Sequence, residues 1–513
     1  MKKENISLFD LRNISNCLLA LAVKQLFPSA ILAGGQVTSL GFYYDFLFTA
    51  PFEESFIRQI EDLVLAWVRQ KMEVQMKEMV PVSAREYFNF HKEPLLAKLV
   101  EHSSSPTFFL MQFAGKMILA EEGRPLDHLG VIGAFHLQKS EVIGRKLRIH
   151  GTSFFDKKEL KQFLKSFGDW VHSSHVAVGK EKGLFEEESE GEFLWFPAGQ
   201  KVRSLLGRHF FEEGEGLGFQ EVSSQLFCEK FSWAPFFKAH QKIFETLASP
   251  KSLALMELVT FCNLEDKDFS SGLFNPSLIQ SLRSHVFCEE RHLLRELISY
   301  LHFMTKIFKI LDFEFQVVLI EKRGGLNVKL EEALISLGWE FSRERSSFSG
   351  DLPRVECRVL DGLGRSWPVS CVYSPFLLSR KGFACFAGSP CLSFERLIAL
   401  MLEKKGEVPL WLSLEQVRVM PLQKKHRAFA EKISCSLKEQ GLRSRLYEGE
   451  EELKGKLRLA AHESVPYAVV IGDKELEGDA LTLRNVHKKE ASSLPLQELA
   501  EVLNKQIKRE LLL

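Results

Sequence analysis

The cysteines are the first residues to consider, because a thiolate can bind a metal, attack a substrate or form a disulfide. The sequence has nine of them, at positions 17, 228, 262, 288, 357, 371, 385, 391 and 435. They stand singly, and no CxxC pair is present. This spacing fits reduced thiols better than a disulfide framework or a closed zinc site.

The charged residues could bind a polyanion, but their totals balance. The sequence has 67 basic and 67 acidic residues, so its formal net charge is zero. A chain without net positive charge has no overall attraction for nucleic acid. Any binding of RNA must therefore come from a local patch, and we expect no DNA partner.

The chain has 513 residues, which is enough for two to four domains with cores of their own. Its hydrophobic content of 45% is ordinary for a globular protein, and no apolar run reaches the length that spans a bilayer. The first residues, MKKENISLFDLRN, lack the apolar segment of a secretory signal. We therefore expect a cytoplasmic protein without a membrane partner.

The last hundred residues show the clearest alternation of strands and helices. The apolar residues Val417 to Met420 predict a buried strand, and Lys425 to Lys438 has apolar side chains at helical spacing. Arg443 to Tyr447 and Tyr467 to Ile471 predict further strands, with a helix between them over Leu453 to His462. This order indicates a small parallel or mixed α/β domain.

Three segments of this region carry a resemblance to a known family. WLSLEQVRVMP, EQGLRSR and VPYAVVIGDKELE occur in this order. They resemble the anticodon-binding domain of class II aminoacyl-tRNA synthetases, specifically the threonyl-tRNA synthetases. The resemblance extends in order from Leu11 to the end of the chain, although the family's N-terminal ubiquitin-like domain has no counterpart.

The resemblance implies an α+β multidomain fold in which an antiparallel sheet with helices forms the class II synthetase core. It divides the chain into an editing-like α+β domain over residues 1–150, a helical connector over 151–188, a catalytic-like domain over 189–405 and an anticodon-binding-like α/β domain over 406–513.

The editing-like region departs from the family at four positions. In the family, two histidines of an LRHSAAHVLA helix, with the cysteine and histidine of a CRGPH segment, shape the pocket that hydrolyses mischarged tRNA. The equivalent residues here are Asn13, Cys17, Glu121 and Pro125. None of them supplies an imidazole for acid–base chemistry. We therefore expect a retained scaffold without a hydrolytic site.

The zinc site of the family is also altered. There, the cysteine of a PMNCPGH loop and two histidines bind a catalytic zinc, which keeps the open position that a substrate needs. We find no counterpart of that loop between IFETLASPKS and LALMELV. SHVFC retains His285 as one ligand, Ala387 stands at the position of another, and Cys262 aligns with the motif 2 cysteine instead. The sequence predicts a vestigial metal position at His285 and no bound zinc.

The ATP-binding motifs are retained only in part. Leu264 stands at the motif 2 arginine that holds the α-phosphate, and a leucine cannot make that bidentate contact. Motif 3, SFERLIALML, keeps Arg396 at its ATP-binding position. Arg396 is either a remnant of that contact or a helix N-terminal arginine paired with Glu395 or solvent. Gln225 replaces the motif 1 proline in the segment that forms the class II dimer interface. Further substitutions in substrate-side segments fall at Asp351, Leu352, Pro368, Tyr373 and Pro375.

The anticodon-binding-like region keeps part of a basic surface. GEEELKGKLRL aligns with RNEKIGFKIRE, the family's loop and helix that contact the anticodon. Glu450 and Glu452 oppose RNA binding, because carboxylates repel phosphates. Alternatively, this segment is a solvated helix start whose acids favour the helix dipole. The predicted tRNA-binding residues are Glu451, Lys454, Lys456, Arg458 and Arg484.

These substitutions favour one function and leave others open. Losing one charge-stabilising group typically lowers a catalytic rate by about a hundredfold or more. The favoured hypothesis is a threonyl-tRNA synthetase-like protein that has lost threonine activation and editing and binds tRNA or a protein. The alternative is an active threonine–tRNA ligase with a rebuilt site, which would use ATP with Mg²⁺ and zinc. A homodimer, or a heterodimer with an intact synthetase, is compatible with either hypothesis.

Overall fold

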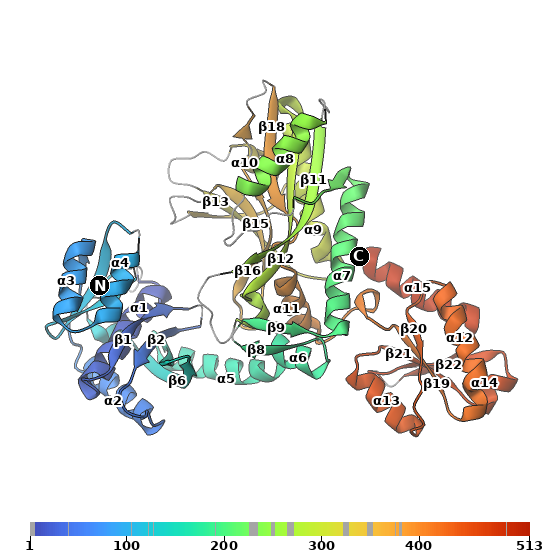
Figure 1. Cartoon of the computed structure of the whole chain (residues 1–513), viewed down its shortest axis with the longest axis horizontal. Coiled ribbons are helices and arrows are strands. Elements are labelled where there is room, and N and C mark those ends of the chain that lie inside the picture. The colour runs from blue at the N-terminus through green and yellow to red at the C-terminus, as the bar shows by residue number, and fades with distance from the viewer. Residues whose placement is uncertain are drawn as a thin grey trace. The chain divides into compact units, whose positions relative to one another are not determined.

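The structure is a computed structural model, and it divides into two compact units, Met1–Gly168 and Asp169–Leu513 (Figure 1). In the first unit, strand β7 (Lys146–Phe154) pairs with β6 (Ala134–Ile143) as far as Phe154. The domain limits given above stay predictions. The structure describes residues 6–38, 40–103, 105–121, 123–126, 128–189, 191–224, 234–247, 252–263, 271–321, 328–345, 352–374, 376–378, 382–488 and 490–512.

The first unit is built around helix α1 (Leu8–Leu26), whose residues from Asp10 to Val23 are all buried. Ser7 and Asp10 form a reciprocal capping box that satisfies the first free N–H groups of the helix. Its remaining elements are β1 (Ile31–Val37), β2 (Phe42–Leu47), α2 (Ser55–Arg69), β3 (Gln75–Met79), α3 (Pro81–Phe90), α4 (Pro94–His102), β4 (Phe108–Phe113) and β5 (Lys116–Ala120). Two antiparallel sheets result, in the orders β1-β2-β7-β6 and β3-β4-β5.

The core of the second unit is a sheet in the order β10-β11-β12-β18-β16-β15-β13-β14, with β17 paired to β18. Most neighbours are antiparallel, while β10 with β11 and β13 with β14 are parallel. This confirms the predicted antiparallel core with helices. Its strands are β10 (Phe219–Glu221), β11 (Ser252–Cys262), β12 (Leu278–Glu289), β13 (Gln316–Glu321), β14 (Ser342–Arg345), β15 (Arg354–Leu360), β16 (Ser366–Tyr373), β17 (Phe376–Leu377) and β18 (Phe383–Ser389).

The helices of this part pack on the sheet and share its apolar core. The fully buried side chains of α9 and α11 belong to the same cluster as those of β12 and β15. The elements are α5 (Lys157–Ser173), which crosses the limit between the units, α6 (His175–Glu181), a hairpin of β8 (Phe185–Ser189) and β9 (Glu192–Trp195), α7 (Pro197–Gly216), α8 (Ala234–Thr246), α9 (Leu293–Ile310), α10 (Val328–Ser336) and α11 (Phe394–Lys405).

A buried hydrogen bond between side chains joins α6 to α11. His175 Nδ1 lies 2.7 Å from a carboxylate oxygen of Glu403, and both side chains are almost inaccessible. The other ring nitrogen of His175 accepts a hydrogen bond from the backbone N–H of Leu273 at 2.9 Å. Burial opposes ionisation of Glu403, but its bonds to His175 and to the N–H of Gly362 hold its pKa below the usual value.

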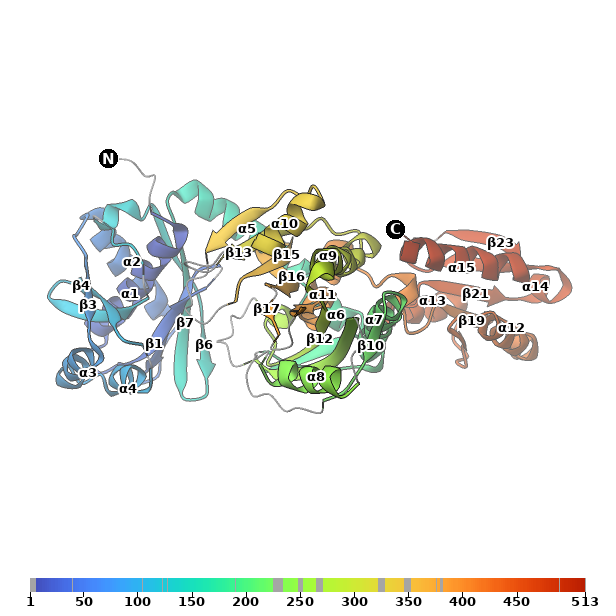
Figure 2. The ribbon, with the colours of Figure 1, turned by 90° about the horizontal axis from the view of Figure 1, so that it is seen from above.

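The C-terminal part has the predicted order of strands and helices (Figure 2). Its sheet runs β20-β19-β21-β22-β23, with β19 parallel to both β20 and β21. Helices α12 and α15 pack on one face, and α13 packs on the other. The elements are β19 (Val417–Pro421), α12 (Arg427–Glu439), β20 (Ser444–Leu446), α13 (Leu453–His462), β21 (Tyr467–Ile471), α14 (Asp473–Glu477), β22 (Ala480–Asn485), β23 (Ala491–Pro495) and α15 (Leu496–Leu512).

Among the described residues, no helix combines the length and the apolar character needed to cross a membrane.

Candidate functional site

The structure brings together three of the four editing positions in the first unit. Asn13 lies on α1, and its amide donates to the backbone carbonyl of Glu121 at 2.8 Å. The N–H of Glu121 donates back to Asn13 at 3.0 Å. The thiol of Cys17, one helical turn further along, faces the carbonyl of Leu119 at 3.6 Å. Pro125 lies outside any helix or strand.

The polar atoms of this cluster are bound to the protein itself. A carboxylate oxygen of Glu121 accepts from the N–H of Val37 at 2.6 Å. Burial raises the pKa of Cys17 far above its usual value, and the nearby Glu121 carboxylate raises it further. The thiol is therefore protonated at neutral pH and is a poor nucleophile. Burial also raises the pKa of Glu121, despite its bond from Val37.

In the second unit, His285 lies on β12 and is 1% exposed. Its Nδ1 is 2.9 Å from Nδ1 of His240, which lies on α8. Nε2 of His240 is in turn 3.2 Å from Glu257, whose carboxylate accepts from the hydroxyl of Ser224 at 2.8 Å. These four residues form a continuous hydrogen-bonded chain, which we call the His285 chain.

The ionisation of the His285 chain follows from its surroundings. Burial, and then the neighbouring His240, holds the pKa of His285 well below its usual value. Burial opposes ionisation of Glu257, but hydrogen bonds from His240 and Ser224 hold its pKa below the usual value. The chain therefore places a neutral His285 at one end and a carboxylate at the other.

The residues around His285 do not fit the zinc of the family. Ala387 is the direct cross-strand partner of His285, so the register confirms the aligned position but supplies a methyl group there. The cysteine ligand of the family's PMNCPGH loop would have to lie beside His285. The ring of Phe237 lies there instead, with 5.7 Å between the two ring centroids. Within the described ranges, no group of three or more His, Cys, Asp or Glu side chains could hold a metal ion.

His240 was not among the site residues predicted from the sequence. Residues 234–240, APFFKAH, end in a histidine as PMNCPGH does, and Phe237 then stands at the cysteine. The expectation that this loop has no counterpart is therefore corrected, because α8 brings residues 237 and 240 against His285. The shared terminal histidine was the signal in the sequence.

Arg396 lies in the first turn of helix α11, and its backbone N–H donates to the hydroxyl of the N-cap residue Ser393. Its guanidinium donates to the carbonyl of Pro368 at 2.6 Å and to that of Phe274 at 3.1 Å, and it lies over the ring of Trp367. The pairing with Glu395 that the sequence suggested is wrong, since Glu395 binds Arg203 at 2.7 Å instead. In this conformation Arg396 joins three segments of the protein. An additional contact to ATP stays a prediction.

The predicted tRNA-binding residues differ in their exposure. Lys454 and Arg458 lie on the exposed side of α13, whereas Lys456 is 3% exposed. The ammonium of Lys456 donates to the carbonyl of Pro421 at 2.7 Å, and burial lowers its pKa. Lys456 therefore does not present its charge to solvent, which corrects its expected place on the RNA-facing surface.

Two further predicted residues lie near α13. Glu451 accepts a hydrogen bond from the hydroxyl of Tyr447 at 2.5 Å. Arg484 is the cross-strand partner of Ala468, which packs against α13. Since directly opposite residues of antiparallel strands point to the same face, Arg484 lies on the α13 side of the sheet. Lys454, Arg458 and Arg484 therefore lie on one side of this sheet.

The two acids that oppose RNA binding lie at or before the start of α13. Glu452 precedes the first turn of α13, where a carboxylate favours the helix dipole. Glu450 forms an ion pair with Lys424 at 2.7 Å. The sequence predictions at Gln225, Leu264, Asp351 and Pro375 fall outside the described residues.

The comparisons with known proteins first define a class. Residues 416–506 match the family model described as an anticodon binding domain. The fold is shared with the RNA binding domain of threonyl-tRNA synthetase from Cryptosporidium parvum, at a TM-score of 0.57 and 19% identity over 65% of this chain and 98% of that one. It is also shared with a putative threonyl-tRNA synthetase from Aeropyrum pernix, at a TM-score of 0.53 and 14% identity. That match covers 66% of this chain and 97% of the other. The chain thus has the fold of an aminoacyl-tRNA synthetase.

Full-length sequence comparison is more specific. The threonine–tRNA ligase of Hahella chejuensis is 26% identical over 97% of this chain and 88% of its own length. The threonine–tRNA ligase of Alkalilimnicola ehrlichii is 24% identical over 97% of this chain and 88% of its own length. The chain is a homologue of the threonine–tRNA ligases over nearly its whole length.

Proposed function

We propose that this protein is a threonyl-tRNA synthetase-like protein that neither activates threonine nor edits, and that it is kept for binding tRNA. The observation that carries the proposal is the surroundings of His285. Its cross-strand neighbour is Ala387, the ring beside it belongs to Phe237, and its Nδ1 is bound to His240. A zinc that binds substrate needs three protein ligands and an open position.

The first unit supports the same conclusion. A hydrolytic pocket needs a group that positions water and exchanges protons with it. Asn13 is bound on both sides of its amide to the backbone of Glu121, and the thiol of Cys17 is buried and protonated. The cluster is therefore tied to the backbone by hydrogen bonds and holds none of the imidazoles of the family's editing pocket.

The binding of tRNA is supported by the anticodon binding domain and by its exposed cations. Lys454 and Arg458 on α13 lie on the same side of the sheet as Arg484. Each phosphate contact contributes roughly one unit to the slope of log affinity against log salt. Three such cations imply a shallow slope of about three units or less.

Filter binding of total tRNA over a series of salt concentrations tests this part of the proposal. We expect weak binding that falls as salt rises, with that shallow slope. If no tRNA binds even at low salt, a protein partner replaces tRNA as the ligand of this scaffold. Formation of threonyl-tRNA by the purified chain would favour the alternative of an active threonine–tRNA ligase, with ATP and Mg²⁺ bound at a rebuilt site.

A further inference from the structure

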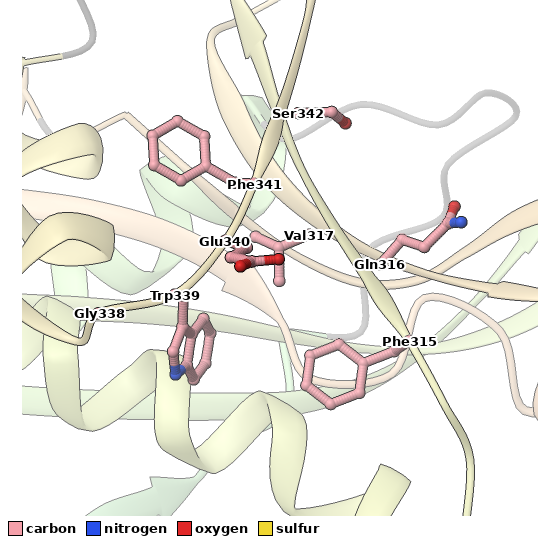
Figure 3. A pocket seen from close by; sticks show the side chains of 8 residues that line it. All are labelled: Phe315, Gln316, Val317, Gly338, Trp339, Glu340, Phe341 and Ser342. Carbon is pink, nitrogen blue, oxygen red and sulfur yellow. The ribbon is translucent and has the colours of Figure 1, made fainter.

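An open cavity of about 690 Å³ lies at the edge of the large sheet. None of the residues that line it belongs to the His285 chain. It opens where two parallel strands separate. Pairing of β13 with β14 begins at Val318 and Ser342, whereas Gln316 and Val317 pair only with β15. Its lining residues, shown in Figure 3, are Phe315, Gln316, Val317, Gly338, Trp339, Glu340, Phe341 and Ser342.

The aromatic walls of the cavity are held from behind by helix α9. Phe315 and Trp339 meet edge to face, with ring centroids 6.4 Å apart and an interplanar angle of 70°. Phe308 stacks on Phe315 at 4.8 Å, and His302 contacts Trp339 at 6.0 Å. Because their neighbours fix these rings, the walls are formed before any ligand enters.

The cavity also carries a negative charge. In Figure 3 the Glu340 carboxylate lies between Phe341 on one side and Trp339 on the other. In the part of the chain that the structure describes, Glu340 forms no hydrogen bond or ion pair, whereas the nearby Arg343 is paired with Glu321 at 2.7 Å and with Glu331. The charge of Arg343 is therefore already balanced.

These features select the charge of a ligand. The faces of aromatic rings are negative, and together with a carboxylate they attract a cation and repel an anion. A neutral ligand would remove water from Glu340 without replacing its interactions. Phe341 already receives a cation on its face, since the Arg343 guanidinium lies 5.2 Å from its ring centroid.

We propose that this cavity binds an ammonium group that carries alkyl substituents. A primary ammonium would lose hydrogen bonds to water that the rings cannot replace, whereas an alkylated one makes apolar contacts with Trp339 and Phe315 and meets the charge of Glu340. None of its lining residues belongs to the His285 chain or to α13, so the proposal does not rest on threonine activation or on tRNA binding.

The test compares choline with its neutral isostere 3,3-dimethylbutan-1-ol and with the anion 3,3-dimethylbutanoate, using ligand-observed NMR on the full chain. We expect choline to bind about fivefold or more tightly than the alcohol, and the anion not to bind. Equal binding of choline and the alcohol, or no binding of choline at about 50 mM, would overturn the proposal.

Two variants locate the binding in the cavity. Glu340→Gln should weaken choline about fivefold or more and leave the alcohol unchanged. Glu314→Gln is the matched control, because Glu314 is an exposed acid next to the lining residue Phe315 but does not itself line the cavity. An equal loss in both variants, or no loss in either, would contradict the site. Tighter binding of Nα-acetyl-trimethyllysine amide than of choline would identify a protein side chain as the source of the ligand, and the reverse would identify a free small molecule.

Discussion

The His285 chain and the surface of α13 both correspond to functional regions of the synthetases, but their charged groups behave differently. Around His285 the polar atoms bind one another, from His240 to Glu257, and apolar side chains surround them. On α13, Lys454 and Arg458 remain in contact with solvent. A metal site needs specific donors at fixed positions, so one alanine removes it. Attraction to phosphates is long-range and tolerates partial loss. Under the proposed function, chemistry is lost where it depends on individual atoms, and attraction to phosphates is retained where it depends on summed charge.

The largest effect is expected from a variant that restores the two missing zinc ligands beside His285. The double variant Phe237→Cys, Ala387→His adds a thiolate and an imidazole at two positions that adjoin His285, which completes three ligands. We expect about one zinc per chain in the variant and none in the wild type, measured by elemental analysis after desalting. The single variant Ala387→His is the control and should retain much less zinc. One zinc per wild-type chain would show that the metal site is intact. It would contradict the stated difference between the His285 chain and the α13 surface.

The second prediction concerns the buried contact between His175 and Glu403, which joins α6 to α11. His175→Ala leaves Glu403 buried without its partner, which should lower the free energy of unfolding by about 3–5 kcal/mol. Thermal unfolding of the full chain would measure this loss. Lys454→Ala, at an exposed position, is the control and should leave the melting temperature nearly unchanged. A small effect of His175→Ala would mean that this pair does not hold the catalytic-like part together.

Glu403 also predicts a pH dependence. Its pKa is lower in the folded chain than the usual 4.5, so its contribution is fully present above that pH and is lost as the pH falls toward the folded value. The wild type should therefore lose stability below about pH 4.5 more steeply than Glu403→Gln does. Parallel unfolding curves of the two proteins across that range would contradict the assignment.

A smaller effect is expected on α13. Replacing Lys454 and Arg458 with alanine should lower the affinity for all tRNAs alike and reduce the salt slope by about two units. The matched control replaces Lys432 and Lys438, exposed cations on α12 at the opposite face of the sheet. If both double variants lose affinity equally, the binding is nonspecific and the α13 surface has no special role.

The smallest effect comes from the acids that oppose these cations. Replacing Glu450 and Glu452 with lysine removes repulsion of phosphates and frees Lys424 from its ion pair with Glu450. Affinity for tRNA should rise several-fold, most strongly at low salt. Binding no better than that of the wild type would mean that RNA does not approach this end of α13.

The sequence predicted the secondary structure and the equivalence of distant positions better than the direction of single side chains. The predicted strand at Tyr467 to Ile471 and the helix at Leu453 to His462 match β21 and α13, because their apolar residues follow the periods of a strand and a helix. Lys456 was misplaced, although it precedes the buried Ala460 by one turn on the same face. The sequence therefore shows the apolar face of the helix, but the charge of Lys456 was taken as a sign that this residue is exposed.

The His285 chain could not be predicted in the same way. Pairing of residue 285 with Ala387 depends on the register between strands a hundred residues apart, and the family resemblance supplied that position. The terminal histidine of APFFKAH pointed to His240 as a residue, but its contact with His285 depends on how α8 packs on the sheet. The partners of Arg396, two backbone carbonyls, also follow only from the folded chain.

Threonine-dependent exchange between ATP and pyrophosphate tests the central claim most directly, because it measures adenylate formation without requiring tRNA. The purified full-length chain would be assayed beside an active threonine–tRNA ligase at the same concentration, with and without threonine. We predict no threonine-dependent exchange above the blank without enzyme. Exchange well above that blank would contradict the account and would establish that this chain activates threonine with a rebuilt site.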